Sequence, residues 1–188
     1  MTLGKWKKIK TEEIYQCGKF YRVYKDKVLT PGKKPGCYHV VRWPHNSIIV
    51  VPVDKDGMFY LTKQHRYPIN DFSLEFPAGN TDDKETTLQA AKRELKEEMH
   101  LASSKWKKLG EFYEAEGFTD LKFVAYLAED VYGVNGESKD PIDQNLHQTK
   151  KLSLVEIERK IRKGEMHSAK TMTSLILYKL KYAAKTLR

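Results

Sequence analysis

The stretch that opens at Gly79 and closes at Glu98 constrains this chain more than any other. A turn-forming glycine precedes a predicted helix whose second half carries three carboxylates, Glu94, Glu97 and Glu98. Residues three and four positions apart lie on one face of a helix, so these side chains project together. Carboxylates this close repel unless a cation lies between them, and Mg²⁺ takes carboxylate oxygens while leaving positions for phosphate and water. The spacing therefore predicts a divalent-metal site on this helix.

A solvated charged face is the alternative interpretation of the same helix. Lys92, Arg93 and Lys96 could neutralise the carboxylates through local pairs, and charged helical faces are common. The metal site is favoured because the carboxylates belong to a longer pattern. That pattern runs Gly79, five residues, Glu85, seven residues, and then Arg93-Glu94-Leu95-x-Glu97-Glu98.

This longer pattern resembles the Nudix box of the Nudix hydrolases. One position departs from the family, because His100 stands where a glycine normally ends the helix. A left-handed residue there costs least for glycine, but histidine tolerates that conformation better than most residues. A cation near a helix C-terminus is also favourable. We therefore interpret His100 as a changed helix cap.

The carboxylates have separate expected roles in cleaving a pyrophosphate. A metal ion there bridges phosphate oxygens, lowers the pKa of water and orients its attack. We expect Glu94 and Glu98 to be the principal ligands, with Glu97 either a shared ligand or the group that polarises the water. The resemblance implies that the backbone carbonyl of Ala78 is a further ligand. Mg²⁺ is the expected ion, with Mn²⁺ as an alternative, because an all-oxygen site accepts both.

Glu85 and Arg93 complete the predicted catalytic set together with Glu97. They are eight residues apart, about two helical turns, so contact along a straight helix would be strained. If Glu85 lies instead at the junction of loop and helix, Arg93 could lock the loop over the helix. The resemblance implies this structural role, and an ordinary surface ion pair is the alternative.

A wider resemblance points to the ADP-ribose and nucleoside-diphosphate-sugar pyrophosphatase branch of the family. It is carried by residues 64–68, 74–79 and 164–171. It implies that Arg66 lies near the substrate phosphates, where a planar guanidinium binds bidentately. It also implies that Arg42, with Trp43, reaches a nucleobase across a dimer interface. Core packing of Trp43 and an ordinary strand-surface position for Arg42 are the alternatives.

Two departures from this branch concern the choice of substrate and the general base. After the box the branch typically shows Ser-Pro-Gly, a mark of ADP-ribose enzymes, whereas Glu116 stands here in place of the proline. The branch also draws a catalytic glutamate from a loop before the penultimate helix. That loop offers Glu137, Asp140 and Asp143, of which Glu137 is favoured, and Glu97 remains an alternative base.

The composition narrows the class of protein. At 188 residues, 40 % of them hydrophobic and 11 % aromatic, the chain is expected to be globular, and no apolar run is long enough to span a membrane. The basic N-terminus lacks the apolar core of a signal peptide. Cys17 and Cys37 form neither a disulfide framework nor a metal-ligand spacing, which favours free thiols and a cytoplasmic location. The net charge of +9 suggests an anionic partner.

The order of elements predicts a mixed α+β domain. The expected strands are a hairpin over 13–24 and segments 38–43, 48–53, 58–65, 107–113 and 122–127. The expected helices span 85–99, 153–163 and 169–187, and a long loop covers 129–149. The resemblance implies a Nudix-type α/β/α sandwich around a mixed sheet over residues 46–188. It also implies an N-terminal β subdomain over residues 1–45 that serves homodimerisation.

We therefore expect an enzyme that hydrolyses the pyrophosphate bond of ADP-ribose or another nucleoside diphosphate sugar. The products would be a nucleoside monophosphate and a sugar phosphate. One alternative is a pyrophosphohydrolase acting on RNA 5′ ends, suggested by the net charge and the lysine-rich termini. That hypothesis is weakened because the basic patches lack interleaved aromatics or a nucleic-acid motif. The other is a nucleotide-sensing Nudix module that does not cleave, suggested by His100 and argued against by the intact carboxylates.

Overall fold

The computed structural model describes residues 3–135 and 147–182, which divide into two compact units. One unit comprises Met1–Asn46 and Tyr113–Lys122, and the other comprises Ser47–Phe112 and Phe123–Arg188. Among the described residues, no helix is long and apolar enough to cross a membrane.

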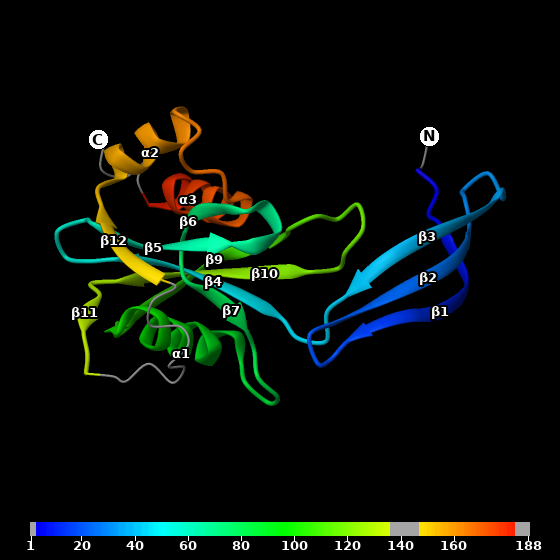
Figure 1. Ribbon diagram of the computed structural model, residues 1–188, viewed down its shortest axis with the longest axis horizontal. Coiled ribbons are helices and arrows are strands. Elements are labelled where there is room, and N and C mark those ends of the chain that lie inside the picture. The colour runs from blue at the N-terminus through cyan, green and yellow to red at the C-terminus, as the bar shows by residue number, and fades with distance from the viewer. Residues whose placement is uncertain (1–2, 136–146, 183–188) are drawn as a thin grey trace. The chain divides into compact units, whose positions relative to one another are not determined.

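The first unit is built on a three-stranded antiparallel sheet (Figure 1). Its strands are β1 (Lys7–Cys17), β2 (Tyr21–Leu29) and β3 (Pro35–Arg42). The β1–β2 hairpin turns through Gly18, whose φ of +50° favours a residue without a side chain. The segment 113–122 joins this unit at β3, where the Val41 amide donates to the Phe118 carbonyl at 2.9 Å. The predicted hairpin is confirmed, with strands longer than 13–24.

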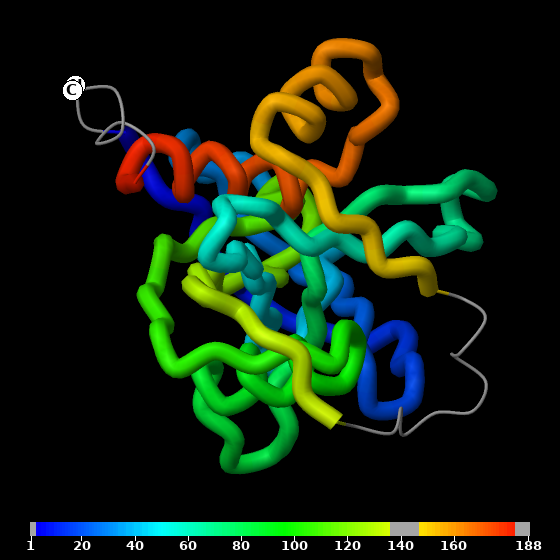
Figure 2. Tube along the Cα trace, turned by 90° about the vertical axis from the view of Figure 1, so that its left-hand side faces the viewer, coloured from blue at the N-terminus to red at the C-terminus, as the bar shows by residue number. Residues whose placement is uncertain are grey.

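The second unit contains a seven-stranded mixed sheet in the order β12-β5-β4-β10-β9, with β6 paired to β5 and β7 paired to β4. Its strands are β4 (Ser47–Val53), β5 (Phe59–Arg66), β6 (Asp71–Glu75), β7 (Ala78–Asn80), β9 (Lys105–Tyr113), β10 (Lys122–Glu129) and β12 (His147–Leu152). β4 runs parallel to β10 and antiparallel to β5 and β7. Figure 2 shows β12 beside the β5–β6 hairpin, in agreement with its antiparallel pairing to β5.

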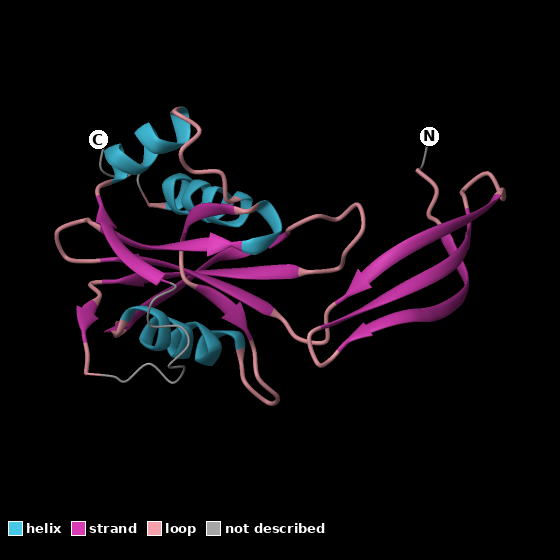
Figure 3. Ribbon diagram, viewed as in Figure 1, coloured by secondary structure: helices cyan, strands magenta, loops and turns pink. Residues whose placement is uncertain are grey.

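In the described part of this unit, three α-helices cover the two faces of the sheet. They are α1 (Thr87–Met99), α2 (Leu154–Arg162) and α3 (Ala169–Lys181). α1 lies on one face, and α2 and α3 lie on the other, so the unit is an α/β/α sandwich (Figure 3). The expected fold class is therefore confirmed.

The position of β4 in the core explains why residues 48–53 of its sequence are all apolar. Every residue of β4 is buried, because helices cover both faces of the sheet. Ile48 and Val50 pack with Leu95 of α1 and Val124 of β10 in one cluster. Alternate residues of a strand project to opposite faces, so Ile49 lies on the side away from this cluster.

Several expected boundaries differ from the structure. α1 begins at Thr87 and not at residue 85, because Thr86 caps it, and α3 ends at Lys181. The expected loop over 129–149 is shortened by β12, and the strands β6 and β7 were not predicted. The short elements η1 (Tyr67–Ile69), β8 (Leu101–Ala102) and β11 (Tyr132–Gly133) were also not predicted. On α3, Leu175 is buried and Ile176 is 56 % exposed.

Candidate active site

Gly79 and Glu94 bring β7 and α1 into close contact. β7 pairs with β4, with Gly79 opposite Ile48. A Cβ placed on Gly79 would overlap the carboxylate of Glu94, so only glycine leaves room for that side chain. The glycine at the start of the sequence pattern therefore permits a close approach of a carboxylate to the backbone.

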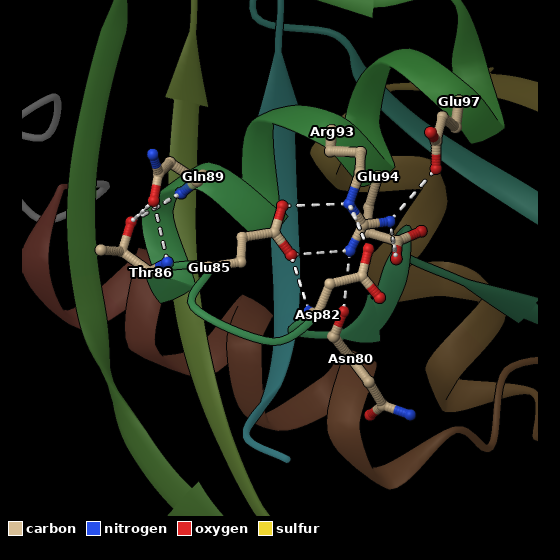
Figure 4. A network of polar contacts seen from close by, with 8 residues as sticks. All are labelled: Asn80, Asp82, Glu85, Thr86, Gln89, Arg93, Glu94 and Glu97. Carbon is tan, nitrogen blue, oxygen red and sulfur yellow. Dashed lines mark hydrogen bonds and ion pairs between the residues drawn. The ribbon is translucent and has the colours of Figure 1, made fainter. Parts of the chain in front are cut away.

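α1 begins with a capping box just after Glu85. The Thr86 side chain accepts from the Gln89 amide, and the Gln89 side chain accepts from the Thr86 amide at 2.9 Å (Figure 4). Such a cap satisfies amide groups that have no partner within the helix. Glu85 thus stays in the preceding loop, where its Oε2 accepts from the Asp82 amide at 2.9 Å.

Arg93 joins this loop to the helix. Its Nε donates to Oε1 of Glu85 and its Nη2 to Oε2 of Glu85, both at 3.0 Å. Nη2 also donates to the Asn80 carbonyl at 2.8 Å, and Nη1 donates to Glu94 at 2.7 Å and Glu97 at 3.1 Å (Figure 4). The predicted contact between Glu85 and Arg93 is therefore present. It forms because Glu85 lies before the helix, as the junction hypothesis required.

These contacts set the charge states of the groups around Arg93. The paired carboxylates raise the pKa of Arg93, with Glu85 the largest contributor, and hydrogen bonds from Arg93 lower the pKa of Glu85. Burial raises the pKa of Glu94, although Arg93 counters this shift. Arg93 is therefore a permanent cation that neutralises part of a crowded acidic cluster.

Glu98 is the most perturbed carboxyl of the cluster. Burial, followed by the charge of Glu94, raises the pKa of Glu98 to about 8. Its Oε2 is buried with no hydrogen-bond partner among the described residues. Because a buried charge without a partner is costly, this oxygen requires either a proton or a cation.

A second charged group consists of Glu75, Arg66 and Lys170. Glu75 at the end of β6 is 3 % exposed and accepts from Arg66 twice, Nε to Oε1 at 2.9 Å and Nη2 to Oε2 at 2.7 Å. Nζ of Lys170, in the first turn of α3, lies 3.0 Å from Oε2 of the same carboxylate. Although burial opposes the shift, these two cations hold the pKa of Glu75 at about 2. Both also favour the ionised form of Glu98, so the two groups share one electrostatic environment.

Glu75 and Lys170 were given no role from the sequence. The available signal was a carboxylate inside an otherwise apolar segment, Leu74-Glu75-Phe76-Pro77, because a buried carboxylate needs a cation. The partner Lys170 lies 95 residues further along the chain, and nothing in the sequence links the two.

The donor atoms on α1 suit a hard divalent cation. Carboxylate oxygens are the ligands that Mg²⁺ prefers, and the buried, unpartnered Oε2 of Glu98 is an oxygen of this type. Glu94 lies one turn earlier on the same helix, and Ala78 directly precedes Gly79 in β7. Within the ranges 3–135 and 147–182, no three acidic, histidine or cysteine side chains already converge as a ligand cage. One reason is that Arg93 pairs with Glu94 and Glu97.

His100 adopts the backbone conformation expected of the missing glycine. It is the C-cap of α1 with φ 52° and ψ 39°, and its amide donates to the carbonyls of Leu95 and Lys96. The interpretation of His100 as a changed helix cap is confirmed. The helix that carries the carboxylates therefore ends normally without glycine.

Arg42, Trp43 and Glu116 lie in the first unit. Nη2 of Arg42 donates to Asp26 at 2.6 Å, and the guanidinium of Arg42 lies 4.5 Å from the centre of the Tyr24 ring. The ring of Trp43 lies 5.4 Å from that of Tyr21, and Trp43 lines a cavity of about 210 Å³. Glu116 lies exposed in the turn before Thr119. Glu137, Asp140 and Asp143 lie outside the described residues.

Comparison with known proteins defines the class of this chain. A solved structure described as a crystal structure of ADP compounds hydrolase covers 98 % of both chains with a TM-score of 0.85 at 18 % identity, a likeness of fold. An ADP-ribose pyrophosphatase from Bacillus subtilis (strain 168) is 28 % identical over 94 % of each chain. A methanol dehydrogenase activator from Bacillus methanolicus is 26 % identical over 95 % of each chain.

The family model for the NUDIX domain matches residues 43–173. This match covers most of the chain, including β4, Gly79 of β7, the carboxylates of α1 and the start of α3. The chain therefore belongs to the NUDIX domain family.

Proposed function

We propose that this protein is a divalent-metal-dependent hydrolase that cleaves the pyrophosphate bond of a nucleoside diphosphate sugar. The products are a nucleoside monophosphate and a sugar phosphate. Membership of the NUDIX domain family and the similarity to an ADP-ribose pyrophosphatase support this reaction. The observation that carries it is the buried, unpartnered oxygen of Glu98, whose ionisation Glu94 opposes and Arg66 and Lys170 favour.

Mg²⁺ is the proposed ion, and Mn²⁺ also suits an all-oxygen site. Glu94 and Glu98 would be its main ligands and the Ala78 carbonyl a further ligand, with Glu97 either a shared ligand or the group that polarises the water. When bound, the ion supplies positive charge to the phosphate oxygens and lowers the pKa of a water. Glu97 is the proposed base among the described residues, because it lies on the same face of α1 as Glu94.

The other charged residues position the substrate and the helix. Arg66 binds the pyrophosphate through guanidinium N–H groups other than the two that Glu75 accepts. Arg93 and Glu85 act structurally, because they hold the loop before α1 to the carboxylates. Arg42, with Trp43, reaches the nucleobase across the dimer interface, and Glu116 contributes to the choice of substrate.

We also propose a cytoplasmic homodimer. Cys17 and Cys37 are free thiols, which suits a reducing compartment. In the first unit, β1 and the residues that flank it carry large apolar side chains that are about half exposed, which favours burial against a second copy. They include Trp6, Ile9, Tyr15 and Phe20. Light scattering coupled to size-exclusion chromatography checks this, and a monomer at micromolar concentration would contradict it.

The reaction is tested by measuring phosphate-containing products from a panel of substrates. The panel contains ADP-ribose, ADP-glucose, UDP- and GDP-sugars, dinucleoside polyphosphates and triphosphorylated RNA, each with Mg²⁺ and with chelator. Chelator-sensitive cleavage of a diphosphate sugar is the expected result. Cleavage of RNA alone would replace the proposed function with RNA 5′-end processing. Nucleotide binding without any cleavage would indicate a sensor.

A further inference from the structure

The pairing between β5 and β6 places Arg66 and Glu75 on one face of the sheet. Thr62 lies opposite Glu75 in this antiparallel pair, and Gln64 lies opposite Ser73. Directly opposed residues project to the same face, and every second residue of a strand returns to it. Arg66 therefore extends along the face that carries Glu75 and meets its carboxylate.

The contact between the two side chains fixes the guanidinium plane. Nε and Nη2 of Arg66 are both occupied by Glu75, in the paired geometry that carboxylates make with arginine. The Glu75 side chain is 4 % exposed, whereas that of Arg66 is 40 % exposed. The carboxylate thus lies inside the protein and anchors an arginine that a ligand in solvent can reach.

Lys170 anchors Glu75 from the opposite element. Its side chain is only 16 % exposed and reaches Oε2 of Glu75 from the first turn of α3. The next residue, Thr171, is fully buried and accepts from the Phe76 amide at 3.2 Å. α3 therefore holds both the side chain of Glu75 and the backbone that follows it. That backbone leads within three residues to Gly79, beneath Glu94.

Two cations converge on the carboxylate of Glu75. Arg66 and Lys170 both contact it, although a structural ion pair would need only one of them. The charges of both cations also act on Glu98, where they counter the effect of burial. A pyrophosphate bound beside Glu98 would therefore lie in the electrostatic environment of Arg66 and Lys170.

We propose that Glu75 and Lys170 are positioning residues that hold the Arg66 guanidinium in the orientation that binds the substrate's pyrophosphate. This inference rests on the proposed function, because Arg66 must bind the pyrophosphate for its orientation to matter. Lys170 acts through Glu75, and Glu75 acts through Arg66.

The orientation itself is tested without turnover, by nuclear magnetic resonance of protein labelled with ¹⁵N-arginine. The Arg66 Nε–H signal is assigned by its loss in Arg66→Lys. In the wild type we expect slow hydrogen exchange at this group, because it is bonded to a buried carboxylate. Glu75→Gln and Lys170→Met should both accelerate that exchange, whereas Lys179→Met should not. Lys179 is the matched control on α3, since it pairs with Glu158. Unchanged exchange in both test variants would overturn the proposal.

The kinetic test uses the substrate that the panel ranks first. We expect Glu75→Gln to raise KM about tenfold or more while kcat changes less than about threefold, because ground-state binding of the pyrophosphate is lost. In an Arg66→Met background, Glu75→Gln should add less than about a twofold effect, because residues that act as a unit are not additive. Fully additive effects would overturn the proposal.

A conservative variant keeps the test valid if Glu75→Gln fails to fold. Lys170→Met should then raise KM, and Lys170→Arg, which keeps the charge, should restore it to within about threefold of wild type. Equal losses in both Lys170 variants would contradict a positioning role. If the wild type cleaves no diphosphate sugar, the proposed function fails, while the exchange of Arg66 Nε–H still decides the orientation separately.

Discussion

The backbone at Gly79 leaves space that the carboxylate of Glu94 occupies. A Cβ on residue 79 would overlap that carboxylate. The atoms that it would meet are the mobile end of a side chain, so Glu94 would move while β7 kept its pairing. A methyl group at this position thus offers a way to displace one proposed metal ligand alone.

Gly79→Ala should therefore reduce kcat/KM by roughly 100-fold, since a displacement of about 1 Å at a catalytic group has this effect. The free energy of unfolding should change little. Steady-state kinetics and urea denaturation measure the two quantities. Gly133→Ala is the control, because its Cβ meets no atom within 4 Å. Wild-type kinetics in Gly79→Ala would show that the position of Glu94 is unimportant.

Arg93→Ala should lower both stability and metal affinity. The variant removes the contacts to Glu94 and Glu97 and leaves a cluster of like charges. It also removes the contact to Glu85 that holds the loop before α1, so the proposed ligands are no longer held in place for a metal ion. Hydrogen bonds between charged groups at a partly buried site suggest a loss of about 1–3 kcal/mol in the free energy of unfolding.

Thermal denaturation and titration with Mn²⁺ check this prediction for Arg93. The neighbouring and exposed Lys92 supplies the matched variant, Lys92→Ala, which should leave both quantities unchanged. If the two variants showed the same thermal stability and the same affinity for Mn²⁺, Arg93 would have only the role of an ordinary surface residue.

The site on α1 could be predicted from sequence because its parts are local. The spacing of Glu94 and Glu98 and the junction position of Glu85, one of two hypotheses, lie within about twenty residues. The capping box at Thr86 is equally local but was not predicted. Helical geometry converts such spacing directly into spatial proximity. The role of His100 could be predicted for the same reason, because the conformation of a helix cap depends on the backbone next to it in sequence.

The remainder of the site depends on tertiary packing. Glu75 meets Lys170 only because β6 and α3 pack together, and no periodicity connects residues so far apart. β7 and β12 were missed for a similar reason, since short strands form where a neighbouring strand offers its edge. The apolar run of β4 was predictable because burial on both faces leaves a direct mark on the sequence.

Glu98→Gln should stabilise the protein when metal is absent. The folded state holds the pKa of Glu98 at about 8, above the value of 4.5 expected when unfolded. A carboxyl with a raised pKa destabilises the fold increasingly as pH rises from about 4.5 to 8. At pH 7, removal of this charge should add roughly 1–3 kcal/mol to the free energy of unfolding.

Urea denaturation with chelator at pH 5 and pH 8 measures the free energy of unfolding of wild type and Glu98→Gln. The increase caused by the substitution should be larger at pH 8. Added Mg²⁺ should stabilise the wild type more than Glu98→Gln, because the variant lacks a ligand. Glu116→Gln, in an exposed turn, should show neither effect. A Glu98→Gln variant that is less stable than wild type in chelator would contradict the buried, unpartnered state of the carboxylate.

Glu75→Gln should act on stability with the opposite dependence on pH. The folded state lowers the pKa of Glu75 from 4.5 to about 2, so its ion pairs stabilise the protein above about pH 4.5. This contribution disappears as pH falls from about 4.5 towards 2, because the unfolded carboxyl takes up a proton first. A shift of this size in a buried group corresponds to at most about 3 kcal/mol at neutral pH.

Urea denaturation of wild type and Glu75→Gln between pH 3 and pH 7 tests this dependence. The difference in free energy of unfolding should be constant from pH 7 to about pH 5.5 and should then shrink. Glu12→Gln, on the exposed strand β1, should show no such difference. A constant gap down to pH 3 would mean that the loss comes from packing of the new side chain. If the difference in free energy of unfolding shrinks at low pH, the loss comes from the ion pairs that Glu75 makes with Arg66 and Lys170.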